Sequence, residues 1–279
     1  MATRGANRVK CHYCGFEDTF PARCTSCGAT QLSLEGLGTE KLESTLAEGF
    51  PGARIARLDR DVAAGMASEK VLARVRRGEV DILVGTQIVT KGHDLPNVTL
   101  VGVINADAAL SMPDFRAGER TFQLLVQVGG RAGRHERPGR VLIQTRSPEH
   151  PAILFAAKHD VDGFLRAELV DRRETNYPPI ARLALLRIEA VDEKLAEAAA
   201  RALSEVARAT RVVESRAVEV MGPAPAPIPR LRGRFRFRVM LRAAERPPLR
   251  AALAAVQRAM GDLDRRVRAV IDVDPVSML

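Results

Sequence analysis

Four cysteines near the N-terminus have the spacing of metal ligands. They form two Cys-x2-Cys pairs separated by nine residues, and each pair is followed by a glycine; the cysteines are Cys11, Cys14, Cys24 and Cys27. A tight turn aims backbone N–H groups at the thiolates, and Gly15 and Gly28 tolerate the positive φ that it requires. We predict that the thiolates bind Zn²⁺. The alternative is redox-active or merely buried pairs, but a thiol oxidoreductase needs its Cys-x2-Cys at a helix N-terminus, and the glycines argue against that.

A second pattern, Gln-x-x-Gly-Arg-x-Gly-Arg, occupies residues 127–134 and contains Arg131 and Arg134. Two arginines three residues apart can reach one polyphosphate, and a bidentate guanidinium stabilises the charge that develops on a transferring phosphoryl group. A basic, glycine-rich surface loop has the same composition. The pattern alone leaves both interpretations open.

Polar residues follow directly after an expected strand that ends at Val84. Thr86 and Gln87 come first, and the segment 91–96 contains Asp94. Hydroxyl, amide and backbone N–H groups at a strand end suit a nucleic-acid backbone. Asp94 has two interpretations: it orients a ribose or an arginine, or it forms a turn or helix cap before Pro96.

The segment 232–238 alternates arginine with glycine or phenylalanine. On a strand, Phe235 and Phe237 point to one face, where we expect core packing, and three arginines point to the other: Arg234, Arg236 and Arg238. The arginine face either tracks phosphates or is the solvated side of an amphipathic strand. Further on, Asp272 and Asp274 either bind a metal or, as we expect, flank a strand end and pair with local arginines.

Composition favours a polyanionic partner. The 279 residues carry a net charge of +9, and residues 222–279 hold twelve arginines, no lysine and five acidic residues. An arginine-rich genome would raise the charge as well. No apolar run approaches the roughly 20 residues of a membrane span. Residues 1–10 lack an apolar secretory segment, so we expect a cytoplasmic protein with reduced thiols, which favours metal binding over disulfides.

The elements that must position these residues are α/β in character from residue 35 onward. A helix is expected to begin at Gly38 or Thr39, a second at Ser68, and a third over 116–128. Short apolar runs predict buried strands, at 55–58, 81–84, 99–104 and 140–144. Strands that alternate with helices predict a doubly wound parallel sheet, whose ligands lie at the carboxyl ends of the strands.

A second domain is expected after a boundary near 171–180. Its predicted elements follow a βαββαβ ferredoxin-like order: 182–190, 193–209, 217–221, 234–242, 247–260 and 267–273. The proline-alternating segment 222–229 is expected to be a stiff polyproline-like loop outside the ladder. The expected domains are therefore 10–34, 35–170 and 171–279.

Four segments in order resemble motifs IV, V and VI of superfamily 2 helicases. They read GLGTE, RLDRD, GTQIVTKGHDLP and QVGGRAGR, at 36–40, 57–61, 85–96 and 127–134. With the cysteine pairs before them and the RGRFRF and DVDP segments after them, the chain resembles the PriA family of bacterial primosomal replication-restart helicases from about residue 9 onward. The resemblance implies a second RecA-like helicase lobe, an embedded zinc module and a C-terminal DNA-binding domain.

The resemblance also implies roles for individual residues. Arg134 corresponds to an arginine finger, with Arg131 as its companion on the phosphates. Gln127 and Asp94 correspond to positions near the ATP site between two lobes. Four more correspond to contacts with the single-strand backbone: Gly38, Thr39, Thr86 and Gln87. The implied partners are single-stranded and forked DNA, primosome proteins and single-stranded-DNA-binding protein, in a bacterial cytoplasm at the nucleoid.

Two departures from the family pattern bear on activity. The family has eight cysteines in a nested arrangement around two zinc ions, and this sequence contains the last four. By that pattern, Cys11 and Cys14 would share one zinc with an absent pair, and Cys24 and Cys27 another. The sequence also contains no GxxxxGK[ST] phosphate-binding loop, so we expect ATP and Mg²⁺ to bind only with an N-terminal helicase lobe. The alternative function is a non-enzymatic zinc-ribbon module for DNA binding or assembly.

Overall fold

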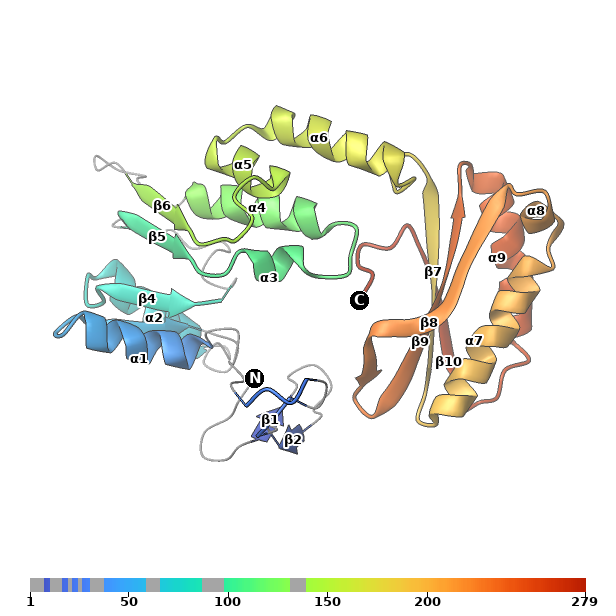
Figure 1. Ribbon diagram of the computed structural model, residues 1–279, viewed down its shortest axis with the longest axis horizontal. Coiled ribbons are helices and arrows are strands. Elements are labelled where there is room, and N and C mark those ends of the chain that lie inside the picture. The colour runs from blue at the N-terminus through green and yellow to red at the C-terminus, as the bar shows by residue number, and fades with distance from the viewer. Residues whose placement is uncertain are drawn as a thin grey trace. The chain divides into compact units, whose positions relative to one another are not determined.

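The computed structural model describes residues 8–10, 17–19, 22–24, 27–30, 38–58, 66–86, 98–130 and 139–279. The chain divides into two compact units, and Figure 1 labels the helices and strands of both. The first unit contains residues 1–30, 113–116 and 167–279, and the second contains 31–112 and 117–166. The last division between the units along the chain falls inside α6 (Val161–Glu174), after Arg166.

The second unit contains two pairs of parallel strands. In the first pair, β3 (Ile55–Leu58) runs beside β4 (Ile82–Gly85), in a register that places Leu58 opposite Gly85. Helix α1 (Thr39–Gly49) precedes β3, and α2 (Met66–Arg76) connects the two strands. Leu58 of β3 and Leu72 of α2 are fully buried and form the centre of a small apolar core. The parallel pairing expected from alternating strands and helices is confirmed here.

The second parallel pair joins β5 (Leu100–Val103) to β6 (Arg140–Ile143). Its core is helical: Phe122 stacks on Phe164 with ring centroids 4.0 Å apart. Three further helices complete this part of the unit, and they are α3 (Asp107–Leu110), α4 (Ala117–Gly129) and α5 (Pro151–Ala157). Helix α4 buries residues at helical spacing, which fixes one face inward and leaves its opposite face in solvent.

The first unit is built around a four-stranded antiparallel sheet of order β10-β7-β9-β8. Its elements are β7 (Arg182–Ala190), α7 (Glu193–Arg208), α8 (Arg211–Glu214), β8 (Val218–Leu231), β9 (Arg234–Ala243), α9 (Arg246–Met260) and β10 (Arg268–Val273). Helices α7 and α9 cover one face of the sheet (Figure 1). The βαββαβ order expected for this region is confirmed, with the short α8 as an addition.

Helix α7 shows why this sequence folds as it does. Asp192 caps its N-terminus by accepting a hydrogen bond from the Leu195 N–H at 2.8 Å. Its buried residues lie on one helical face and are mostly small, which lets the helix lie close to the sheet; they are Ala196, Ala199, Ala200, Leu203, Ser204 and Ala207. The sheet meets them with larger apolar side chains such as Ile188, Val239 and Leu241.

The prediction that residues 222–229 stay outside the ladder is wrong. Strand β8 extends to Leu231, and Ala224 and Pro225 pair with β9 between two register shifts. The physical reason is the position of β8 at the edge of the sheet, where one side of the strand needs no ladder hydrogen bonds. The irregular register accommodates the prolines, which lack an N–H group and would interrupt an inner strand.

The sheet face opposite α7 and α9 has an apolar end. Leu183, Leu185 and Met278 are buried there, together with the half-buried Phe115 and Tyr177, among other side chains. The Phe115 and Tyr177 rings stack with centroids 4.8 Å apart. Residues 113–116 therefore belong to this unit by their contacts, although they precede α4 in the sequence.

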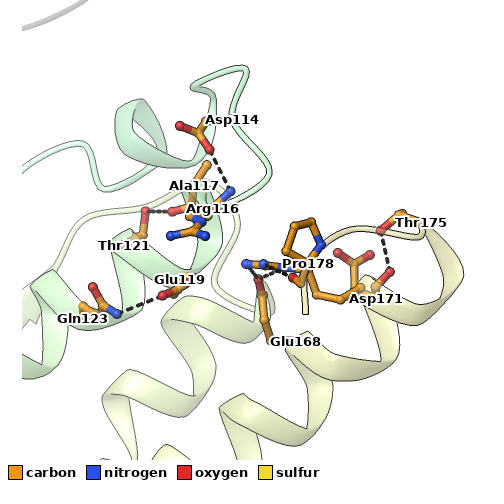
Figure 2. A network of polar contacts seen from close by, with 11 residues as sticks. Asp114, Arg116, Ala117, Glu119, Thr121, Gln123, Glu168, Asp171, Thr175 and Pro178 are labelled. Carbon is orange, nitrogen blue, oxygen red and sulfur yellow. Dashed lines mark hydrogen bonds and ion pairs between the residues drawn. The ribbon is translucent and has the colours of Figure 1, made fainter. Parts of the chain in front are cut away.

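Figure 2 shows two groups of polar contacts, one at Asp114 and one at Glu168, and the Phe115 ring is next in sequence to the first and contacts Arg172 of the second. Asp114 is buried and accepts hydrogen bonds from the backbone N–H groups of Arg116, at 3.0 Å, and Met278, at 3.1 Å. The buried guanidinium of Arg172 lies over the ring and donates to Glu168 at 2.9 Å and to the Pro178 carbonyl at 2.7 Å. These bonds satisfy charged groups that burial would otherwise penalise.

A short antiparallel pair precedes the cysteine turn that the structure describes. Strand β1 (Arg8–Lys10) pairs with β2 (Glu17–Thr19), and Cys11 and Cys14 fall between them in the sequence, outside the described residues. None of the helices in the described part of the chain combines the length and the apolar content needed to cross a bilayer.

Candidate nucleic-acid and nucleotide site

Three predicted contacts with a single-strand backbone lie at one edge of the second unit. Thr86 follows β4 directly and is exposed, and Gly38 and Thr39 begin α1. A salt bridge joins the two places: Arg57, near the carboxyl end of β3, lies 3.1 Å from Glu40 in the first turn of α1. Because Arg57 is opposite Val84 in the parallel register, the start of α1 and the end of β4 share the carboxyl edge of this strand pair.

The start of α1 combines the positive end of a helix with the Glu40 carboxylate, which pairs with Arg57. Gly38 is extended, with φ −60° and ψ 152°, and its carbonyl accepts the first helical hydrogen bond, from Leu42 N at 3.0 Å. Among the described residues, Gly38 is the N-cap and provides no side-chain cap. The aligned peptide dipoles give this end a partial positive charge, and first-turn amides suit phosphate oxygens. Gln87, predicted to contact the single strand, and Asp94, predicted to lie near the ATP site, are outside the described residues.

Helix α4 leads into the arginine-containing pattern. Gln127 lies in its last turn and is exposed, and its predicted place near the ATP site stays a prediction. Gly129 is held close to the His159 ring, whose Cε1 atom would be 2.7 Å from an added Cβ. This glycine therefore permits a close approach within the unit. Arg131 and Arg134 lie outside the described residues, so their predicted roles stay predictions.

The second cysteine pair lies in a tight turn. The Gly28 N–H donates to the Cys24 carbonyl at 2.9 Å, and the Cys24 N–H donates to the Ala29 carbonyl at 2.8 Å. Gly28 has φ +72°, the positive value predicted for this position. Cys24 is half-buried and Cys27 is exposed. The geometry fits one half of a tetrathiolate zinc site. Among the described residues, no three potential ligands cluster, but Cys11 and Cys14 are outside that set.

The arginines of β9 are engaged in the sheet itself. Arg236 is 6% exposed, and its Nε lies 3.3 Å from Oε1 of Glu189, directly opposite on β7. Arg238 donates to the Met278 carbonyl at 3.5 Å, and Arg234 to the Arg266 carbonyl at 3.1 Å. The predicted core packing of the phenylalanines is confirmed, because Phe237 is buried and Phe235 packs against the core of the unit.

The sequence predicted only some of the acidic residues that pair with arginines on this face of the sheet. Asp272 pairs with Arg187 at 2.6 Å, which confirms the expectation that it meets a local arginine. Glu189 was not singled out, although Arg187 and Glu189 alternate on β7 with the same period-two spacing as the arginines of β9. That alternation indicates a shared face, but only the strand order identifies which charges are neighbours.

The region of the parallel strand pairs and the antiparallel domain after it match two different family models. Residues 33–136 match the family model of the helicase conserved C-terminal domain, and residues 173–276 match that of the primosomal protein N C-terminal domain. The chain therefore contains a RecA-like second helicase lobe in addition to the domain found at the C-terminus of primosomal protein N.

Similarity to curated proteins identifies one family within this class of protein. The chain is 39% identical to replication restart protein PriA of Bacillus subtilis over 279 residues, which are 99% of this chain and 34% of the relative. It is also 39% identical to PriA of Haemophilus influenzae over 270 residues (96% of this chain, 37% of the relative) and 36% identical to PriA of Treponema pallidum over 274 residues (97% and 41%). The chain belongs to the PriA family and corresponds to its C-terminal portion. It spans between about a third and two fifths of the length of these relatives.

Proposed function

We propose that the chain is the C-terminal part of an ATP-dependent 3′–5′ DNA helicase that acts in replication restart, during primosome assembly at stalled forks. The observation that carries the proposal is similarity to PriA proteins along 96–99% of the chain, with the helicase motifs in order. The ferredoxin-like plan of residues 171–279 belongs to this proposal and is supported by the strand order β10-β7-β9-β8.

The carboxyl edge of β3 and β4 supports a role in holding a single strand. Gly38 and Thr39 offer backbone N–H groups at the positive end of α1, and Thr86 offers a hydroxyl from the neighbouring strand end. Such groups bind phosphate and sugar without reading bases, as a translocating helicase requires. Gln87 extends the same set in sequence.

Phosphoryl transfer needs a P-loop, Mg²⁺ and an arginine finger from facing lobes. In this proposal the chain supplies the finger: Arg134 stabilises the charge on the transferring phosphoryl group, Arg131 assists, and Gln127 and Asp94 line the nucleotide site. ATP and Mg²⁺ bind when the lobe that carries the P-loop is present. Zn²⁺ is held by the cysteine turns, which contact forked DNA, primosome proteins or single-stranded-DNA-binding protein. A nucleoid-associated location in the bacterial cytoplasm follows from this role.

The test uses two proteins: the chain by itself, and a fusion in which it replaces the corresponding part of the Bacillus subtilis relative. We expect the chain by itself to bind single-stranded DNA without hydrolysing ATP, and the fusion to show DNA-stimulated hydrolysis. Arg134→Ala in the fusion should reduce kcat on the order of 10³-fold or more. Arg137→Ala removes the same charge from the same segment and should leave kcat within about twofold, since it is not a motif residue.

Two outcomes count against the proposal. Hydrolysis in the fusion that survives Arg134→Ala removes the arginine-finger role. A fusion that binds DNA and never hydrolyses ATP supports the other candidate function, a zinc-ribbon module for DNA binding or assembly without catalysis.

A further inference from the structure

One end of the antiparallel sheet gathers two arginine-rich segments. Residues 230–234 form the tip of the β8–β9 hairpin, and residues 264–268 connect α9 to β10. The hydrogen bond from Arg234 Nη2 to the Arg266 carbonyl holds the two segments side by side. Their arginines form the hairpin-end cluster: Arg230, Arg232, Arg234, Arg265, Arg266 and Arg268.

The charges of this cluster are mostly not neutralised. Asp264 binds the Arg266 guanidinium through Nη2 at 2.6 Å and Nε at 3.0 Å, and this hydrogen bonding lowers the pKa of Asp264 to about 2. That pair is therefore neutral overall at any ordinary pH. Arg232, Arg265 and Arg268 are exposed, and no salt bridge involves them within the part of the chain that the structure describes.

Few carboxylates lie near the cluster, and some of them already pair with other arginines. Glu189 faces Arg268 across the ladder, but its Oε1 lies 3.3 Å from the buried Arg236. Asp262 precedes the second segment, and Asp192 acts on Arg266 from the start of α7. Three exposed guanidiniums thus remain at this end. The arginines further along β9, in contrast, are held by Glu189 and by the Met278 carbonyl.

The surroundings of the cluster indicate the chemistry of its partner. Leu263 packs against the core of the unit, and the Phe235 ring lies under the Arg230 guanidinium at 5.0 Å. The tip has a glycine with positive φ, Gly233, with open space around it. A membrane-surface site combines cations with exposed apolar side chains. Val191 after β7 and Val270 on β10 are exposed near this end, but the guanidiniums outnumber them, and guanidiniums suit the phosphates of a nucleic acid.

We propose that the hairpin-end cluster is the surface on which residues 171–279 bind the phosphates of single-stranded DNA, with Arg232, Arg265 and Arg268 as the contacting residues. The inference rests on the DNA binding in the proposed function, and it moves the phosphate contact from the middle of β9 to the end of the sheet. Arg236 acts in the sheet and not on DNA.

The experiment measures fluorescence anisotropy of a labelled oligothymidine with the full chain over a range of salt concentrations. The test variant combines Arg232→Ala, Arg265→Ala and Arg268→Ala. Each lost contact to a single strand lowers the slope of log K against log salt by about 0.7, so the slope falls by about 2. At about 0.1 M salt, this corresponds to a loss of affinity on the order of 100-fold.

A matched control removes three exposed arginines on helices α8 and α9 of the same domain: Arg211→Ala, Arg246→Ala and Arg250→Ala. Its net charge equals that of the test variant, and we expect its salt slope to stay within about 0.5 of the original. A gain variant, Asp264→Asn, keeps an oxygen for the Arg266 N–H but releases the guanidinium. It should steepen the slope by about 0.7 and tighten binding about fivefold at 0.1 M salt.

The outcomes separate this inference from the proposed function. If the original chain does not bind single-stranded DNA, the DNA-binding part of the proposed function fails. If it binds and the test variant keeps its slope, or the control loses as much as the test variant, the hairpin-end cluster is not the contact surface. Binding to anionic vesicles that depends on the same three arginines, without an effect on oligothymidine, assigns the cluster to a membrane and overturns the inference.

Discussion

Replacing Arg236 with alanine should destabilise the antiparallel domain without weakening DNA binding. The arginine is 6% exposed, and it is 3.3 Å from the Glu189 carboxylate, whose side chain is 24% exposed. Removing one partner of a fully buried pair costs about 3–5 kcal/mol, because the other charge stays desolvated and alone. Water reaches part of Glu189, which reduces this penalty. We therefore expect a loss of about 2–3 kcal/mol in the free energy of unfolding.

The assay is urea denaturation followed by tyrosine fluorescence. The chain contains no tryptophan and two tyrosines, so a Tyr13→Phe background leaves Tyr177 as the reporter in the affected unit. Replacing both partners, Arg236→Met with Glu189→Leu, should recover most of the loss, since apolar substitutes for a buried pair are often neutral. As a matched control, Arg201→Ala breaks the exposed Arg201–Glu197 pair, and we expect a change of about 0.5 kcal/mol or less.

The opposite pattern would refute the reasoning. A phosphate contact predicts that Arg236→Ala unfolds at the original urea concentration, binds single-stranded DNA more weakly and has a salt slope lower by about 0.7. In that case the Arg236–Glu189 ion pair does not contribute to the stability of the domain, and the Glu189 carboxylate is stable without the arginine. The double variant distinguishes the two cases again, because a structural pair predicts recovered stability and a DNA contact predicts no recovery of binding.

Two further predictions concern the same unit. Phe115→Ala removes a ring that stacks on Tyr177 and lies under the Arg172 guanidinium, so the unfolding free energy should fall by about 2 kcal/mol in the urea assay, whereas Phe115→Leu should lose about half as much; equal losses would contradict a role for the stacked ring. Purified chain should contain about one Zn²⁺ by elemental analysis if the four thiolates close one site, and Cys24→Ser should abolish it; zinc-free protein with four titratable thiols would show that they do not.

Local patterns predicted most elements and one strand end of the candidate site. The strand 55–58 and the helix over 116–128 follow from apolar runs and helical periodicity, and the structure places them at Ile55–Leu58 and Ala117–Gly129. The position of Thr86 at the carboxyl end of a parallel strand follows from the apolar run before it, and the structure ends that strand at Gly85. Such inferences succeed because they depend on neighbours in the sequence or on a rule of topology.

Features that depend on strand order could not be read from the sequence. The proline-rich segment was excluded from the ladder because proline interrupts inner strands, and only the edge position of β8 removes that objection. The contact between Asp114 and Met278 joins residues 164 positions apart, so nothing local indicates that residues 113–116 leave the helicase lobe's contacts for those of the C-terminal domain.

The arginines of the last domain show why a charge pattern on a strand has two meanings. An arginine inside a ladder is desolvated by the strands on both sides, so it needs a partner, and Arg236 has Glu189. An arginine at the end of the ladder stays hydrated and needs none, as Arg232 and Arg268 show at the hairpin end. The same repeated residue type therefore stabilises the fold in the middle of the sheet and offers charge at its end. Only the second kind is available to a phosphate, and the excess positive charge of residues 222–279 is useful for binding where the ladder stops.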